Sequence, residues 1–212
     1  ERDIACDYVT QQHKAFIAEM EKLSGRKLQL DKLEDLIRNS EKSVSAWQKV
    51  VGEFSKRNIN PTALFDGISF LITSRCKAET SQLYMAMADE YRELQPTDDE
   101  LIPIFWLGYP LWYHPARYLT EILDGYRISG SNYITWWSLD YSGKDSFEKL
   151  FQAYNYTFLN LTQKTRTEKL SKCIAESNAV GAITLRNKSC KCDFVSAKNV
   201  GLPQVEIEID MI

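Results

Sequence analysis

Five cysteines give this 212-residue chain its chemistry beyond hydrogen bonding: Cys6, Cys76, Cys173, Cys190 and Cys192. Cys190 lies in a polar turn, residues 187–191, which directly follows the apolar, partly β-branched run at residues 179–185. Cysteine thiolates hold iron–sulfur clusters, and nearby cations and N–H donors stabilise the thiolate. Cys190 is therefore a candidate cluster ligand, and the alternative is a small side chain that only packs.

The other cysteines do not form a metal site within one segment. Because the chain has no Cys-x-x-Cys pair, we do not expect a self-contained zinc or ferredoxin-type site. Cys192 follows Cys190 by two residues, and alternate residues of an extended segment point in opposite directions, so both thiols reach one metal only if the backbone turns there. Cys76 is either a second reactive thiol or a structural residue, and Cys6 and Cys173 fit packing positions on helices.

A second candidate for chemistry is the loop at residues 108–115, which begins Gly108, Tyr109, Pro110. It follows a predicted strand, and ligands of open parallel sheets bind where strands end. Its aromatic residues and prolines are suited to a pocket for a flat or thioester-bearing ligand. We interpret His114 as part of the start of a helix that Pro115 opens, with an acid–base role as the alternative.

Composition and missing motifs exclude several function classes. The chain has neither a Gly-x-Gly-x-x-Gly loop nor a Walker-type lysine loop, which argues against nicotinamide or ATP chemistry. Its formal net charge is -3 with both signs spread along the sequence, so we expect neither a nucleic-acid nor a membrane partner. The odd, irregularly spaced cysteines favour a reducing compartment, and we predict a cytoplasmic protein.

The first part of the chain is predicted to be almost entirely helical. Apolar residues recur at three- and four-residue steps in each of the expected segments. Asp31 with Glu34 resembles a capping box at the start of the second helix, and Asn60 before Pro61 marks the start of the third. The expected helices are 9–23, 31–51, 60–72 and 78–94.

After the polar break at residues 95–99 the chain alternates between strands and helices, which is the βαβ signature. The expected strands are 101–107, 133–138, 179–185 and 205–210, and the expected helices are 115–126, 146–159, 165–177 and 193–200. We predict an α/β fold in which a helical segment, 1–95, precedes a Rossmann-like domain, 96–212. The domain should contain a mostly parallel four-stranded sheet with helices on both faces.

The last predicted strand ends close to the end of the sequence with no helix after it. A buried parallel strand is normally followed by a covering helix. We therefore expect the sequence to be an incomplete chain.

Three stretches together resemble subunits of the 2-hydroxyacyl-CoA dehydratase and benzoyl-CoA reductase family. The first is Asn187-Lys-Ser-Cys-Lys191, followed by Gly201-Leu-Pro203 and the strand from Val205. The second is the helix around residues 154–160, and the third is Gly25-Arg-Lys-Leu28 with the apolar stripe that ends at Trp47. The resemblance runs over essentially the whole chain and is to the second half of a family subunit.

The resemblance implies an iron–sulfur enzyme that works on an acyl-CoA substrate. In such an enzyme a low-potential electron, delivered by an ATP-dependent activator, leads to loss of water from a 2-hydroxyacyl-CoA. It implies a second dehydratase subunit as a partner and a 4Fe-4S cluster, with Cys190 as the matching ligand. We predict that the substrate is bound by residues of the loop after the first strand and by the neighbours of Cys190: Gly108, Tyr109, Pro110, Asn187, Ser189 and Lys191.

The chain also departs from the family pattern. The expected end of the second strand reads Trp136-Trp-Ser-Leu-Asp140 and contains no cysteine, and Cys192 stands where the family usually has proline. Family members carry a further α/β domain upstream. These departures leave open a second reading, in which the chain is a non-catalytic scaffold or electron-transfer subunit, and a third, in which it is a benzoyl-CoA reductase-type subunit.

Overall fold

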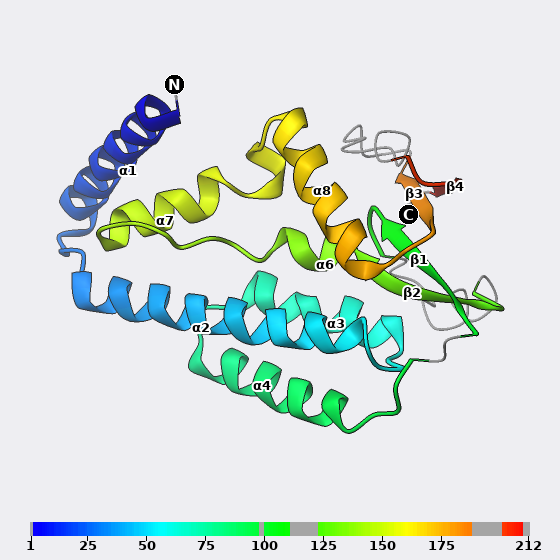
Figure 1. Cartoon of the computed structure of the whole chain (residues 1–212). Helices are drawn as coiled ribbons and strands as arrows, with labels where there is room; N and C mark the ends of the chain where they lie inside the picture. Colours follow the sequence, from blue (N-terminus) through cyan, green and yellow to red (C-terminus); the bar gives the residue numbers. More distant parts are fainter. Residues whose placement is uncertain (1, 98–99, 111–122, 188–200, 210–212) are drawn as a thin grey trace.

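The computed structural model of the chain describes residues 2–97, 100–110, 123–187 and 201–209 (Figure 1). Four helices come first and confirm the predicted helical segment: α1 Arg2–Ser24, α2 Leu30–Phe54, α3 Pro61–Thr73 and α4 Ala78–Arg92. Asn60 caps α3 as predicted, because its side chain accepts a hydrogen bond from the amide of Thr62 at 2.9 Å. No helix of the described residues is long and apolar enough to cross a membrane.

The predicted capping box at Asp31 is wrong. Helix α2 begins at Leu30 with Gln29 as its N-cap, and no side chain caps it. The amide of Leu33 already donates to the carbonyl of Gln29 at 3.1 Å, so Asp31 lies inside the first turn. A carboxylate in that position still interacts favourably with the helix dipole.

The sheet is four-stranded, entirely parallel and ordered β2-β1-β3-β4, which confirms the predicted fold class. Its strands are β1 Ile102–Leu107, β2 Tyr126–Ser131, β3 Gly181–Asn187 and β4 Gln204–Ile209. Helices cover both faces. Trp106 of β1 contacts Phe65 of α3, with ring centroids 5.8 Å apart. The neighbouring residue Phe105 points to the other face, toward the end of α8 Gln163–Ser177.

The predicted second strand, 133–138, is wrong, because residues 132–136 form the short helix α6 Asn132–Trp136. The strand lies earlier, at Tyr126–Ser131, and directly follows the turn at Gly125, whose φ is +76°. Its small residues are needed because neighbouring side chains pack closely against the strand. A Cβ on Gly130 would lie 2.9 Å from both Phe105 and Ser177. Residues 133–138 are rich in β-formers, but their aromatic side chains are used to fill the core from a helix instead.

Smaller differences concern the ends of elements. Residues 123–125 are not helical and Tyr126 begins β2, so the predicted end of the helix at 115–126 is wrong. The rest of that range lies outside the described residues, as does the helix predicted at 193–200. Helix α7 Ser146–Asn155 ends before the predicted residue 159 and is followed by the 3-10 turn η1 Phe158–Asn160. Strand β3 starts and ends two residues later than predicted.

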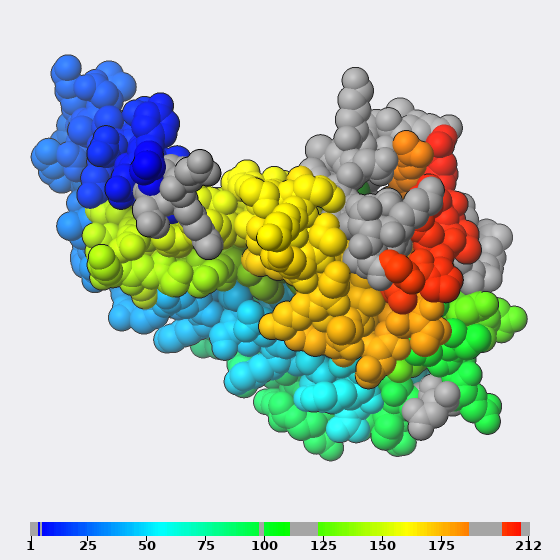
Figure 2. Space-filling model, turned by 45° about the horizontal axis from the view of Figure 1, so that its top comes forward, coloured from blue at the N-terminus to red at the C-terminus, as the bar shows by residue number. Residues whose placement is uncertain are grey.

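One hydrophobic core joins the helices to the sheet. The cluster of buried residues runs from Ile37 in α2 through Phe105 in β1 to Leu185 in β3. Trp47 of α2 is completely buried, and its indole N–H donates to the carbonyl of Ile134 in α6 at 2.8 Å. In Figures 1 and 2, α1 extends from this body and lies beside α7. Whether the chain divides near residue 95 into two domains stays a prediction.

Candidate functional site

The carboxyl ends of β1, β2 and β3 meet at one edge of the sheet, because the three strands are parallel and adjacent. In the register of the sheet Trp106 lies opposite Ser131, and Leu107 lies opposite Thr184. The loop that starts at Gly108, the start of α6 at Asn132 and the end of β3 at Asn187 therefore lie along the same edge. This is the edge where the sequence predicts a ligand site.

Gly108 fixes the path of the chain as it leaves β1. Its φ is +96°, and a Cβ at this position would lie 2.6 Å from the carbonyl oxygen of Leu185 in β3. Only glycine combines this conformation with so close an approach. The amide of Gly108 donates to Oδ1 of Asn132 at 3.0 Å. Gly108 therefore positions the loop, and its N–H is already used within the protein.

Aromatic side chains follow Gly108 and line the same edge. The ring of Tyr109 lies 5.7 Å from that of Tyr133 and 6.2 Å from that of Trp136, measured between centroids. Trp136 stacks on Phe158 at 4.6 Å with an interplanar angle of 19°. Burial raises the pKa of the Tyr133 hydroxyl, so this group remains neutral at neutral pH and can donate a hydrogen bond. These described aromatic residues therefore contribute apolar rings and neutral phenol groups to the edge.

Two cavities open beside this aromatic edge, between α2, α6 and α8. One has a volume of about 390 Å³ and runs along the outer side of β2, past Ser129 and Ser131. The other has a volume of about 320 Å³ and reaches Asn132, Trp136 and Phe158. Cys173 of α8 lines both. Burial raises the pKa of its thiol, which therefore stays protonated and is a poor nucleophile or metal ligand at neutral pH.

The structure places only some of the residues that the sequence singles out. Gly108 and Tyr109 are half-buried at the edge, and Pro110 beside them is fully buried. Asn187 is the last residue of β3, and its side chain lies outside the described part. Ser189, Cys190, Lys191 and Cys192 also lie outside the described residues.

The described cysteines lie apart from this edge or already have packing positions. Cys76 lies in the turn between α3 and α4, as predicted, and its carbonyl accepts a hydrogen bond from Asn39 of α2 at 3.2 Å. Cys6 of α1 lies 3.4 Å from the hydroxyl of Tyr156. No group of three His, Cys, Asp or Glu side chains within the described ranges is arranged to hold a metal ion. The described residues alone therefore supply no ligand set for an iron–sulfur cluster.

Sequence reasoning missed Asn132 and the role of Cys173 as a cavity wall. A signal for Asn132 was present, because Asp124-Gly125 is a turn dipeptide and the six residues after it lead directly to Ser131-Asn132. A strand placed there puts Asn132 at the carboxyl edge. No comparable local signal marks Cys173, because its exposure to the cavities depends on how α8 packs.

Comparison with known proteins shows the family to which the chain belongs. A family model described as 2-hydroxyglutaryl-CoA dehydratase, D-component, matches residues 2–212. The chain is 25% identical to the (R)-2-hydroxyisocaproyl-CoA dehydratase alpha subunit of Clostridioides difficile and 22% identical to the lactoyl-CoA dehydratase subunit alpha of Anaerotignum propionicum. These alignments cover 96% of this chain but only 54% and 52% of the relatives.

A third relative is the (R)-phenyllactyl-CoA dehydratase alpha subunit of Clostridium sporogenes, with 23% identity over 87% of this chain and 47% of the relative. The chain thus spans about half the length of the curated relatives that it matches. Since the family model covers the sequence from residue 2 to its last residue, the chain belongs to the 2-hydroxyglutaryl-CoA dehydratase D-component family.

Proposed function

We propose that this chain forms part of a 2-hydroxyacyl-CoA dehydratase and helps to bind the acyl-CoA substrate at the carboxyl edge of its sheet. The observation that carries the proposal is the arrangement at that edge, where Gly108 and Asn132 join the ends of β1 and β2 directly beside the end of β3. Residues 188–191, which follow β3 in the sequence, include the polar side chains that match the family motif. The relatives named as alpha subunits of such dehydratases support the same assignment.

The proposed binding residues fall into two groups. Gly108, Tyr109 and Pro110 form the loop after β1, in which the ring of Tyr109 supplies an apolar surface. Asn187, Ser189 and Lys191 supply hydrogen-bond donors and one positive charge, which are suited to a thioester carbonyl and to the phosphates of CoA. The buried ring of Tyr133 packs against the ring of Tyr109.

The proposed reaction removes a hydroxyl group from C2 and a proton from C3 of a 2-hydroxyacyl-CoA, which gives an enoyl-CoA and water. This net reaction is redox-neutral. The C3 proton is not acidic enough to be removed directly, and a 4Fe-4S cluster with Cys190 as one ligand would supply a low-potential electron that activates it and would take the electron back as the enoyl-CoA forms. The remaining ligands would come from outside the described residues. We further propose that a second subunit and an ATP-dependent activator complete the system and that the complex is cytoplasmic.

Iron analysis combined with turnover tests this proposal. The chain is purified anaerobically with its native partners and reconstituted with iron and sulfide, and iron content and enoyl-CoA formation are measured in the presence of the activator. We expect Cys190→Ser to lose iron and activity, whereas Cys173→Ser, which changes a half-buried thiol on α8, retains both. Equal iron content in wild type and Cys190→Ser would exclude the ligand role of Cys190.

A second candidate function is that of a non-catalytic scaffold or electron-transfer subunit. It is favoured by the residues directly after β1 and β2, because Gly108 and Asn132 carry no thiol that could bind a cluster. In that case another subunit binds the substrate, and Tyr109→Ala leaves the KM for the acyl-CoA unchanged. Ring reduction of the benzoyl-CoA type is separated from dehydration by assaying both substrates with the same complex.

A further inference from the structure

A cavity of about 570 Å³ lies at the opposite edge of the sheet, where β1 and β2 begin. It is enclosed by the connection between α2 and α3, which includes Arg57 and Asn58, and by residues 123–128 around the start of β2. The carboxyl edge with Gly108 and Asn132 lies at the other end of the same strands. This cavity is therefore separate from the proposed substrate site.

Arg127 of β2 lines this cavity and forms no ion pair with an acidic side chain of the described residues. The residue is half-buried, and its Nε and Nη1 atoms are completely shielded from solvent but have no hydrogen-bond partner. It makes no ion pair with any residue in the described ranges. Asp124, which is exposed and also lines the cavity, lies beyond the 4 Å limit of an ion pair with Arg127.

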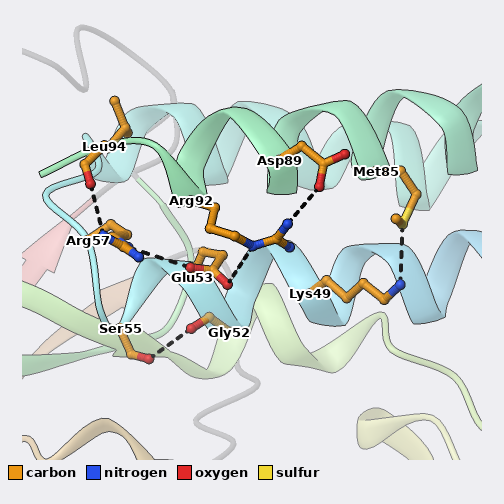
Figure 3. Close-up of polar contacts among 9 residues, drawn as sticks. All are labelled: Lys49, Gly52, Glu53, Ser55, Arg57, Met85, Asp89, Arg92 and Leu94. Atoms are coloured by element: carbon orange, nitrogen blue, oxygen red, sulfur yellow. Dashed lines mark hydrogen bonds and ion pairs between the residues drawn. The ribbon is translucent and has the colours of Figure 1, made fainter. Parts of the chain in front are cut away.

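Arg57, the other arginine in the cavity wall, has an ion pair and a hydrogen bond, although its buried Nε also lacks a hydrogen-bond partner (Figure 3). Its Nε lies 3.7 Å from Oε2 of Glu53, and its Nη1 donates to the carbonyl of Leu94 at 3.1 Å. Glu53 is held in turn by Arg92, whose Nε lies 3.8 Å from Oε1. The same cavity thus contains Arg57, which takes part in a network of α2 and α4, and Arg127, which has no ion-pair or hydrogen-bond partner within the described ranges.

An arginine in this situation lowers the stability of the protein unless an anion pairs with it. Removing a cation from water is unfavourable when no opposite charge replaces the lost hydration. A guanidinium group presents its N–H donors as a planar fork that matches two oxygens of a phosphate or a carboxylate. The exposed amide of Asn58 supplies a further donor in the wall of the cavity.

We infer that the cavity at the amino edge of the sheet binds a small oxyanion ligand through Arg127, with a phosphate or carboxylate group as the recognised chemistry. The inference does not depend on the proposed dehydratase function, because this cavity is lined neither by the loop that starts at Gly108 nor by the segment that contains Cys190. The site would bind an effector or a ligand that stabilises the protein.

Calorimetric titration of the purified chain with inorganic phosphate, pyrophosphate and acetate tests the inference, with sodium chloride added to hold the ionic strength constant. Binding by phosphate or pyrophosphate alone identifies a phosphate site, and binding by acetate as well identifies a general oxyanion site. We expect Arg127→Gln to weaken binding at least about tenfold. The control Arg38→Gln, which removes an exposed arginine that pairs with Asp35 on α2, should change it less than about twofold.

Thermal unfolding without added oxyanion gives an independent readout. If Arg127 lacks a partner, Arg127→Gln has a melting temperature equal to or higher than that of wild type. A lower melting temperature would mean that Arg127 already has a structural partner and would overturn the inference. Asn58→Asp, an exposed substitution that leaves the fold intact, should also abolish binding by repulsion. Unchanged affinity in Asn58→Asp, or no binding of any probe to wild type, would equally overturn it.

Discussion

Gly108 shows how one residue without a side chain determines the geometry of the candidate site. Replacing it with alanine is expected to lower the free energy of unfolding by about 3 kcal/mol, because the new Cβ meets the carbonyl of Leu185 and φ stays at +96°. Denaturant titration measures the loss. Gly25→Ala is the matched control, since φ there is +65° and nothing lies within 4 Å of the added atom. It should cost only about 1 kcal/mol, and an equal loss in both variants would mean that the contact with Leu185 has no effect.

Single residues of the site were predictable only where a strand end was recognised. The apolar run that ends at Leu107 marks a strand, so Gly108 and Tyr109 could be assigned to the carboxyl edge from sequence. Asn132 was missed despite the turn dipeptide at Asp124-Gly125, because the aromatic residues after Asn132 resemble a strand more closely than the small residues before it. The hydrogen bond from Gly108 to Asn132 joins residues 24 positions apart, and no local pattern reports such a pairing.

At the scale of elements, two phenylalanines of α1 and α7 differ strongly in how far they are buried. Phe151 of α7 is 2% exposed and lies 4.6 Å from the ring of His13, whereas Phe16 of α1 is 62% exposed. Phe151→Ala is expected to cost about 3–5 kcal/mol through lost burial and a cavity. Phe16→Ala should cost less than about 0.5 kcal/mol. Equilibrium unfolding in urea measures both, and similar losses would contradict the packing described for α1.

Elements with a long, regular apolar pattern were the predictable ones. The period of about 3.6 residues in α2 and the proline at the start of α3 are independent of the rest of the fold. Strand β2 was misplaced because its sequence, Tyr126-Arg-Ile-Ser-Gly-Ser131, contains small residues where neighbouring side chains leave little room. Gly130 is needed because Phe105 and Ser177 lie too close for a Cβ. Tertiary crowding of this kind overrides the β-propensity of residues 133–138.

At the scale of the whole molecule, tyrosines distributed through the core make stability depend on alkaline pH. Burial raises the pKa of Tyr84, Tyr91, Tyr133 and Tyr141. A tyrosine whose pKa is higher in the folded than in the unfolded state contributes stability that is fully present below its unfolded pKa, about 10, and is lost as the pH rises through the folded pKa. The free energy of unfolding should therefore fall as the pH is raised above about 10.

Urea unfolding at a series of pH values between about 8 and 11 measures this dependence. Tyr133→Phe removes one of the four groups and should flatten the curve on its alkaline side. A curve with the same slope in wild type and Tyr133→Phe would show that the Tyr133 hydroxyl does not titrate differently in the folded and unfolded states. The same variant tests whether the Tyr109–Tyr133 contact requires the phenol or only the ring.

The order of the strands has a consequence for how the sheet opens. Strands β1 and β3 each have a neighbour on both sides, whereas β2 is bordered by β1 alone, and the cavity that contains Ser129 and Ser131 runs along its other side. Among the described residues, no strand lies against the backbone amides on that outer side. In deuterated solvent they should exchange their protons sooner than the amides of β1, so the sheet frays at its edge strands, which include the strand that supplies Asn132, before it frays at its centre.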